Sequence, residues 1–185
     1  MSLATQYMQP NGYGGSPNLL NWTANGASTG WECLDEWPDD GDTTYIQSDG
    51  TKVPSILTKM TLQPPPYGAP TGDELNDLHR ITLRMKRVRT TGTAVNPTIA
   101  FALYQGNGTT LVATSSWSLG TGTSSYVGRN YDLTSGEIST ITDYDDLHLW
   151  IQQSGGSGYD VHVSSARFLI PTASGPQGAH LGHFA

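Results

Sequence analysis

Apolar and polar residues alternate in short runs along most of the chain from Ser55 onward, with turn-forming residues between the runs. Every second residue is apolar between positions 81 and 85, and again between 147 and 151. A period of two is typical of a β-strand with one buried and one solvated face. The runs predict strands near 55–62, 78–91, 97–105, 109–119, 124–133, 146–153 and 159–170. This spacing favours an all-β fold, a sandwich or a barrel, and we predict a single antiparallel β-sandwich.

Local features add detail to this arrangement. The apolar phase changes within 159–170, which predicts a β-bulge or a bend around 164–166. The glycine-rich segments 106–108 and 155–158 are short enough for hairpins. One short helical turn is expected at 72–77.

Turn-forming residues dominate both ends of the chain. Such segments bury too little apolar surface to become ordered alone. We therefore expect an N-terminal extended arm at 1–30, a β-sandwich domain at 31–170 and a C-terminal tail at 171–185, with both arms held by an external surface. Leu181 and Phe184 are the apolar anchors expected in the tail.

The composition narrows the classes of function. Nine basic and sixteen acidic residues give the 185-residue chain a net charge of −7, which disfavours nucleic-acid binding. Charged residues make up 14% of the chain against about 25% in typical domains, so we expect a polar but mostly uncharged surface. The first residues carry no signal-peptide pattern, and no stretch approaches the ~18 apolar residues of a membrane span. We expect a protein that is neither secreted nor membrane-embedded.

An acidic stretch at 32–49 holds seven acids and no Lys or Arg, and a strand is expected within it at 43–46. Two carboxylates can act as a glycosidase pair when they lie ~5–10 Å apart, a distance that sequence spacing does not fix. Asp39, Asp40 and Asp42 could supply oxygen ligands to calcium, but the order of an EF-hand loop is absent. A solvated acidic loop is the favoured interpretation.

No residue stands in a recognisable catalytic pattern. His79, His148 and His162 fall inside predicted strands, where half-exposed sheet residues are more common than catalytic bases. The single cysteine, Cys33, forms no internal disulfide, and its acidic neighbours disfavour a reactive thiolate, so we expect a buried or interface position. We therefore predict no catalytic residue, no cofactor, no metal ligand and no enzyme activity.

Three tryptophans are candidates for a contact surface. Trp31 and Trp37 flank the acidic loop, and Trp150 points outward from a predicted strand. Aromatic rings beside carboxylates and amides suit a sugar, whose C–H face stacks on a flat ring. Tryptophan and tyrosine are also enriched in protein–protein interfaces, which makes contact between subunits the favoured interpretation.

Basic residues form a second candidate surface. Arg80, Arg84 and Lys86 alternate along one predicted strand and therefore share an outer face. In a lone domain this face is solvated. In a repeating assembly it could contact the acidic loop of a neighbouring subunit.

The segment from Trp31 to Ile46 reads W-E-C-L-D-E-W-P-D-D-G-D-T-T-Y-I. It resembles a recurring N-terminal motif of tailed-bacteriophage virion proteins, in which an acidic D-E pair precedes a D-G-D-T-x-Y-I element and a β-sandwich. The resemblance extends over about 30–170. It implies a jelly-roll or lectin-like sandwich without catalytic residues.

The resemblance and the composition together predict a non-enzymatic structural component of a tailed-phage virion. A capsid decoration or cement protein is the leading hypothesis, with other virion proteins and further copies of the chain as partners and with no nucleic acid or membrane. A tail, baseplate or head-fibre subunit is the nearest alternative. The alternative from another class is a carbohydrate-binding module that recognises a host glycan. The expected location is the virion, assembled in the cytoplasm of the host bacterium.

Overall fold

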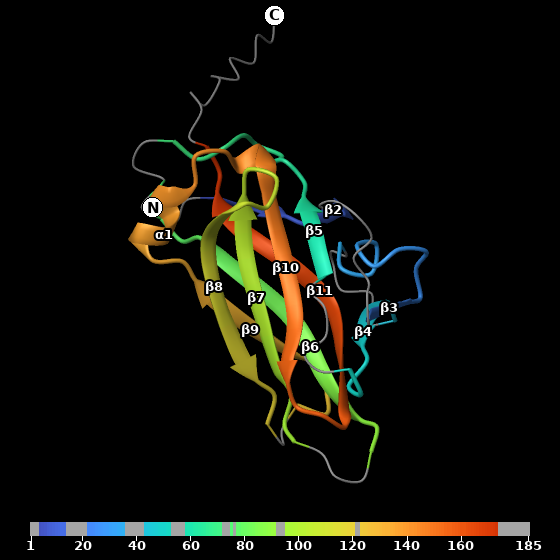
Figure 1. Cartoon of the computed structure of the whole chain (residues 1–185). Coiled ribbons are helices and arrows are strands. Elements are labelled where there is room, and N and C mark those ends of the chain that lie inside the picture. The colour runs from blue at the N-terminus through green and yellow to red at the C-terminus, as the bar shows by residue number, and fades with distance from the viewer. Residues whose placement is uncertain are drawn as a thin grey trace, which may run out of the picture.

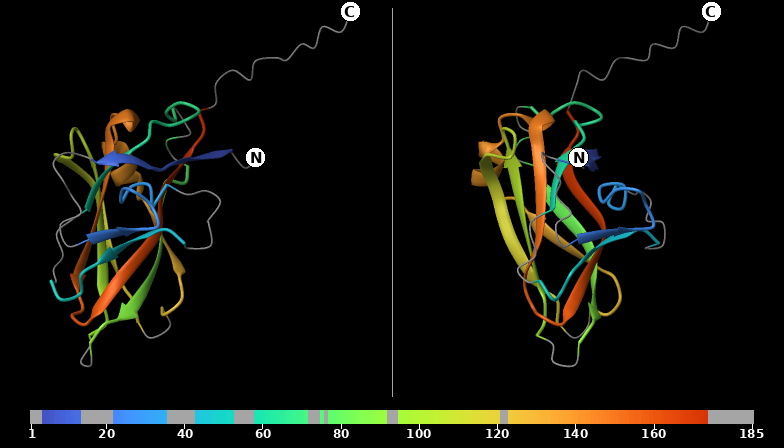
Figure 2. Two further views of the ribbon diagram at one scale, coloured as in Figure 1. Left: turned by 90° about the vertical axis from the view of Figure 1, so that its right-hand side faces the viewer. Right: turned by 45° about the vertical axis from the view of Figure 1, so that its right-hand side comes forward.

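The computed structural model describes residues 4–13, 22–35, 43–52, 58–71, 75, 77–91, 95–120 and 123–173. These residues form two antiparallel β-sheets packed face to face, as the two views in Figure 2 show. The predicted antiparallel β-sandwich is therefore confirmed.

The first sheet has five strands in a continuous order and a sixth beside them (Figure 1). In that order they are β3 (Trp22–Asn25), β4 (Tyr45–Ser48), β11 (Tyr159–Pro171), β6 (Arg80–Arg89) and β9 (Val127–Asp132), and β1 (Thr5–Met8) also pairs with β11. The second sheet has the order β2 (Pro10–Tyr13), β5 (Thr58–Leu62), β10 (Leu147–Gly155), β7 (Thr98–Gln105) and β8 (Thr110–Ser118).

The core lies between the two sheets and is built from the alternating residues of their long strands. Ile81, Leu83 and Met85 on β6 are fully buried, as are Leu149 and Ile151 on β10. Burial of each such side chain contributes about 1.5–3 kcal/mol to folding. The alternation seen in the sequence therefore does define the inner faces, and all seven strands that it predicts after residue 54 are present.

Strand β11 is the longest strand, and three segments in turn pair with the edge that faces away from β6. β4 pairs with it near His162, and β1 pairs with it from Phe168 to Pro171. Between them, the Ala166 amide donates a hydrogen bond of 3.2 Å to the Leu34 carbonyl. The predicted bulge is confirmed, because the register with β6 shifts between Val163 and Ser165.

The N-terminal segment departs from the predicted arm. Residues 5–8 form β1 of the first sheet and residues 10–13 form β2 of the second (Figure 2), so this segment contributes to both layers of the sandwich. The side chain of Gln6 is buried, and its Nε2 donates hydrogen bonds to the carbonyls of Gly68 (2.8 Å) and Pro171 (3.0 Å). Because a polar residue takes this buried position, the apolar pattern did not reveal the strand.

The two glycine-rich connections behave differently. Segment 106–108 joins β7 to β8 as a hairpin, as predicted, and Gly106, Asn107 and Gly108 all have positive φ. Segment 155–158 was also predicted as a hairpin, and this was wrong. It crosses from β10 in the second sheet to β11 in the first, because β5 and β7 already occupy both edges of β10.

Helical structure is scarce among the described residues. The helix α1 (Ser135–Thr140) begins with a capping box between Thr134 and Glu137, and η2 (Tyr144–Asp146) is a single 3₁₀ turn. Most of the helical turn expected at 72–77 lies outside the described residues. No helix in the described ranges is long and apolar enough to cross a membrane.

Candidate functional site

Four side chains form a slanted row across the outer face of the second sheet, which we call the ridge. They come from four neighbouring strands and are Lys59 on β5, Trp150 on β10, Tyr104 on β7 and Leu111 on β8. The Lys59 ammonium lies 3.9 Å from the centre of the Trp150 ring system, and the Tyr104 ring centre lies 4.1 Å from that of Trp150. Because β5 and β7 flank β10 on opposite sides, the lysine and the tyrosine approach the indole from opposite sides.

Strand register explains why these side chains meet. Lys59 is directly opposite Trp150, and Tyr104 is directly opposite Leu111. Leu149 and Ile151, on either side of Trp150, are fully buried, so alternation directs the indole outward. The exposed fraction of Leu111 is 48%, whereas Trp150 is half-buried by its neighbours.

The hairpin loop between β7 and β8 closes one side of the ridge. Gly108 has a φ of +73°, and a Cβ at this position would lie 3.1 Å from Cζ2 of Trp150. The Trp150 Nε1 atom is buried and has no hydrogen-bond acceptor among the described residues. A buried donor without a partner costs about 1–3 kcal/mol of stability. Such a donor is rare in residues that serve only to stabilise the fold.

On the other side of the ridge, the outer face is a floor of small or uncharged side chains. We call these residues the floor: Thr98, Ala100, Ala102, Thr114, Ser116, Ser118, Gln152 and Ser154. Ala102 and Ala100 lie in the middle, where they pair with Thr114 and Ser116. The floor therefore offers hydroxyl and amide groups around an apolar centre and carries no charge.

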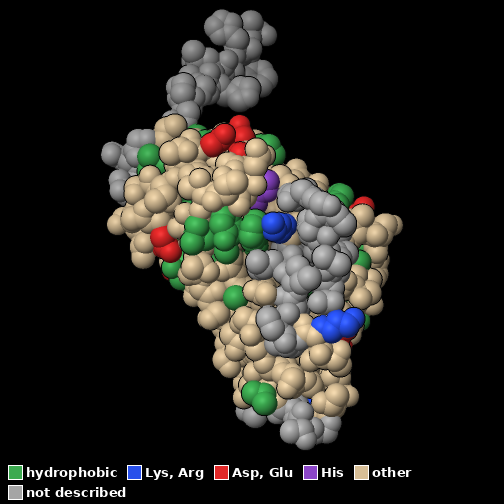
Figure 3. All heavy atoms as spheres, in the orientation of Figure 1, with side chains coloured by type: hydrophobic (Ala, Val, Ile, Leu, Met, Phe, Trp, Pro, Cys, Tyr) green, Lys and Arg blue, Asp and Glu red, His purple; other side chains and the backbone are tan. Residues whose placement is uncertain are grey.

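Figure 3 views this face directly. Apolar side chains gather in one group, a Lys or Arg side chain and a histidine lie beside that group, and most of the surface below it is neither apolar nor charged. Because the side chains of the ridge are larger than those of the floor, the two together form a step on this face.

A histidine–aspartate pair lies at the loop side of the ridge. The Nε2 atom of His148 lies 2.8 Å from the Oδ1 atom of Asp146, and the other oxygen of Asp146 accepts a hydrogen bond of 3.0 Å from the Asn107 amide. These contacts, that of His148 first, hold the pKa of Asp146 below its ordinary value. The carboxylate therefore stays ionised and fixes the Gly106–Gly108 loop beside Trp150.

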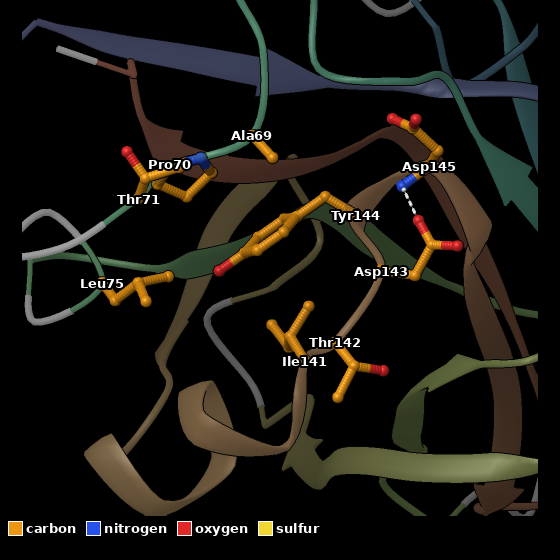
Figure 4. Close-up of a pocket in the computed structure, with 9 residues that line it drawn as sticks. All are labelled: Ala69, Pro70, Thr71, Leu75, Ile141, Thr142, Asp143, Tyr144 and Asp145. Atoms are coloured by element: carbon orange, nitrogen blue, oxygen red, sulfur yellow. Dashed lines mark hydrogen bonds between the residues drawn. The ribbon is translucent and has the colours of Figure 1, made fainter.

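A separate pocket of about 420 Å³ lies between two groups of residues, 69–71 with Leu75 and 141–145 (Figure 4). Pro70 and Leu75 lie on one side of the Tyr144 ring, and Asp143 and Asp145 lie on the other. The exposed fraction of Tyr144 is only 6%, so the pocket offers little aromatic surface to a ligand.

The hydroxyl of Tyr144 is already engaged. It lies 2.7 Å from the Nε2 atom of His79, and the Nδ1 atom of His79 lies 2.9 Å from the Asp77 carbonyl. A carbonyl only accepts, so Nδ1 carries the hydrogen and the Tyr144 hydroxyl donates to Nε2. Burial lowers the pKa of His79 and raises the pKa of Tyr144 to about 12, which keeps both groups neutral.

The two candidate tryptophans that the structure describes, Trp31 and Trp150, do not lie on one surface. Trp150 lies on the second sheet, whereas Trp31 is half-buried in the turn whose Leu34 contacts β11 of the first sheet. Trp37 lies outside the described residues, as do Leu181 and Phe184 of the predicted tail. Alternation identified Trp150, but Lys59, Tyr104 and Leu111 were not identified as its partners, because strand order is not visible in the sequence.

The predicted cationic residues do share the outer face of the first sheet. Arg80 forms an ion pair of 2.5 Å with Asp132. The Lys86 ammonium lies 4.4 Å from the ring centre of Tyr126, and the Arg84 guanidinium lies 5.7 Å from the same ring. These residues belong to the sheet opposite the ridge, so they form a separate surface.

The three strand-associated histidines are more buried than predicted. The exposed fraction is 0% for His79 and 7% for both His148 and His162. His79 packs against Tyr144 and Phe168, and His162 stacks on Tyr45, all from other elements of the fold. Cys33 is fully buried, as expected. Asp39, Asp40 and Asp42, the calcium candidates, lie outside the described residues, and the described ones contain no cluster of three or more acidic, histidine or cysteine residues that could hold a metal.

No protein-family profile matches the sequence, and no curated protein matches it. Among solved structures, an arabinose-bound α-L-arabinofuranosidase matches 91% of this chain at 13% identity with a TM-score of 0.49, and the match spans only 27% of that enzyme. The xylan-binding CBM22-1 domain from Paenibacillus barcinonensis matches 90% of this chain and 98% of its own length, at 10% identity and a TM-score of 0.43. A mannan-recognising carbohydrate-binding module matches 91% and 99%, at 8% identity and a TM-score of 0.42.

Proposed function

We propose that this chain is a non-catalytic carbohydrate-binding domain that holds a glycan on the outer face of the second sheet. The observation that carries the proposal is the step between the ridge and the floor. Trp150 and Tyr104 provide the apolar edge of that step, and Ser116 and Gln152 belong to the uncharged polar surface beside it. A sugar ring has the complementary pattern, because its C–H groups are apolar and its rim carries hydroxyls.

Two features of this face support a sugar over a protein partner. Among the described residues, the floor contains no large apolar side chain, whereas the centre of a stable protein interface is usually apolar. Hydroxyl groups on flanking strands, such as Thr114 and Ser116, can donate and accept hydrogen bonds, as sugar hydroxyls do.

The test is a binding screen of the purified chain against soluble polysaccharides by affinity gel electrophoresis, followed by calorimetry on each ligand found. Trp150→Ala and Tyr104→Ala should each weaken binding by about tenfold or more, which corresponds to about 1.4 kcal/mol. Tyr67→Ala is the matched control, because the Tyr67 ring is 71% exposed and lies on a separate loop. Thermal melts of each variant separate lost binding from lost folding. Binding that survives both ridge substitutions would contradict this site.

Location in a tailed-phage virion is a separate proposal that rests on the sequence motif at 31–46. In the described part of that motif, Cys33, Leu34 and Ile46 are buried, and the Leu34 carbonyl pairs with β11. Packing at the edge of β11 accounts for these residues without a partner protein. Detection of peptides from this chain in purified phage particles would support the virion location, and their absence from particles made in cells that express the chain would contradict it.

A further inference from the structure

The ridge ends in a lysine that has no acidic partner. Lys52 is paired with Asp49 and Arg80 with Asp132, whereas no carboxylate oxygen of the described residues lies within 4 Å of the Lys59 ammonium. The contact of that ammonium with the Trp150 ring holds the charge beside the indole.

Lys59 is also the only cationic side chain on the described outer face of the second sheet. The floor is uncharged, and Leu111, at the far end of the ridge, is apolar. Asp146, the residue before β10, is ionised, but its two oxygens contact His148 and Asn107 and not Lys59. The Lys59 charge therefore lies next to the aromatic part of the site and forms no ion pair with the residues that the structure describes.

We propose that the glycan bound by this face is acidic and that Lys59 selects for its carboxylate. This inference rests on the proposed function and specifies its ligand class. A sugar packed against Trp150 would place a neighbouring carboxylate near the Lys59 ammonium, which would exchange its contact with the indole for an ion pair. Since the chain carries a net charge of −7, a densely charged polymer would be repelled, so the ligand is a mostly neutral glycan with isolated uronate or sialate groups.

Matched pairs of glycans that differ only in charge test this selection. The probes are a sparsely substituted glucuronoxylan with its carboxyl-reduced form, a partly methyl-esterified pectin with its fully esterified form, and sialyllactose with lactose. The acidic member of at least one pair should bind about fivefold more tightly at low salt. The preference should fall in 0.5 M NaCl, where screening is strong. The xylan and pectin pairs probe a uronate within a chain, and the sialyllactose pair probes a terminal sialate.

Substitutions at Lys59 test whether the preference for the acidic glycan depends on this residue. Lys59→Met keeps the aliphatic stem and should bind both members of the pair equally, whereas Lys59→Arg should keep the preference. Lys52→Met is the matched control, because it removes a lysine that pairs with Asp49 away from the ridge.

The possible outcomes separate this inference from the proposed function. If the wild-type chain binds neutral glycans as tightly as acidic ones, or if Lys59→Met keeps the preference, the inference is overturned while the sugar site stands. If the chain binds no member of any pair and no glycan in the wider screen, both proposals fail. Loss of the preference in Lys59→Met alone, with the neutral member bound as before, supports both.

Discussion

Ser48 on β4 and Gln153 on β10 join the two sheets through a buried hydrogen bond, in which Ser48 Oγ donates to Gln153 Oε1 at 2.5 Å. The same serine hydroxyl accepts a hydrogen bond of 2.7 Å from the Val161 amide. The Nε2 atom of Gln153 donates to the carbonyls of Gly156 and Tyr159, each at 3.0 Å, where the chain crosses from β10 to β11. One buried side chain thus satisfies polar groups in both sheets.

Gln153→Leu should lower the free energy of unfolding by about 2–3 kcal/mol. The substitution leaves the Ser48 hydroxyl and the carbonyls of the crossing without their partner in a buried position. Chemical denaturation measures this change. Gln152→Leu is the matched control, since residue 152 points to the outer face, and its effect should stay within about 0.5 kcal/mol. Equal effects of the two substitutions would mean that the buried link contributes nothing.

The hairpin loop beside the ridge gives a test that links backbone conformation to the site. Gly108→Ala should destabilise the fold by about 1–2 kcal/mol, because its φ of +73° is unfavourable for a residue with a Cβ. It should also displace the Trp150 ring, because the new Cβ would lie 3.1 Å from Cζ2, and therefore change indole fluorescence and weaken glycan binding.

Gly106→Ala is the control for this substitution. Its φ is +64°, so the backbone cost is similar, but the nearest atom to its Cβ is the Thr109 hydroxyl oxygen at 3.4 Å and not the indole. We expect similar destabilisation with unchanged glycan binding. If both alanine variants weaken binding equally, the contact with Trp150 is not what couples the loop to the site.

The fold was largely predictable where one face of a strand is purely apolar. Ile81, Leu83 and Met85 revealed β6 without any tertiary information, because the long strand faces the core along most of its length. Helix α1 was missed because it has only six residues, includes Gly136 and is marked only by its Thr134–Glu137 capping box.

The site was only partly predictable for a related reason. Trp150 could be assigned to an outer face from alternation alone. Its neighbours Lys59 and Tyr104 are 91 and 46 residues away along the chain, and they meet it only because β10 lies between β5 and β7. The order β5-β10-β7 is set by pairing between strands that are distant in the sequence, and no local sequence pattern indicates it.

The buried pair of Tyr144 and His79 gives a prediction about stability. Tyr144→Phe should lower the free energy of unfolding by about 1–2 kcal/mol, because it leaves the Nε2 atom of a fully buried His79 without its donor. Tyr67→Phe removes an exposed hydroxyl and should change nothing measurable. Denaturant titration of the two variants side by side checks this. Equal stabilities would show that the hydrogen bond makes no net contribution.

His162 should make stability depend on pH. Its ring stacks on Tyr45 at 4.2 Å between ring centres, and it lies opposite Lys86 and Gln47 on the neighbouring strands. Burial first and then the charge of Lys86 lower its pKa from 6.5 to about 4, while Asp160 opposes this shift. Between these two pH values the unfolded chain binds a proton that the folded chain does not. Stability is therefore highest above pH 6.5 and falls as the pH drops toward 4.

Thermal midpoints measured from pH 7 to pH 4 should show this fall. His162→Gln should flatten the curve in that range, because glutamine does not titrate. Part of the slope should persist, since burial also lowers the pKa of His79. An unchanged slope in the variant would show that His162 is not responsible.

The two N-terminal strands should be required for folding. Met8 is fully buried and pairs with Phe168 of the first sheet. The Gln9 carbonyl accepts a hydrogen bond of 2.8 Å from the Gln63 amide, next to β5 of the second sheet. This segment therefore links the two sheets. Met8→Ala should lower the free energy of unfolding by about 2–5 kcal/mol through the cavity that it leaves, whereas Asn11→Ala, at an exposed position, should lower it by less than about 0.5 kcal/mol.

Deleting residues 1–13 should abolish the cooperative thermal transition. An extended arm would behave in the opposite way, because its deletion would leave the thermal midpoint of the remaining domain unchanged.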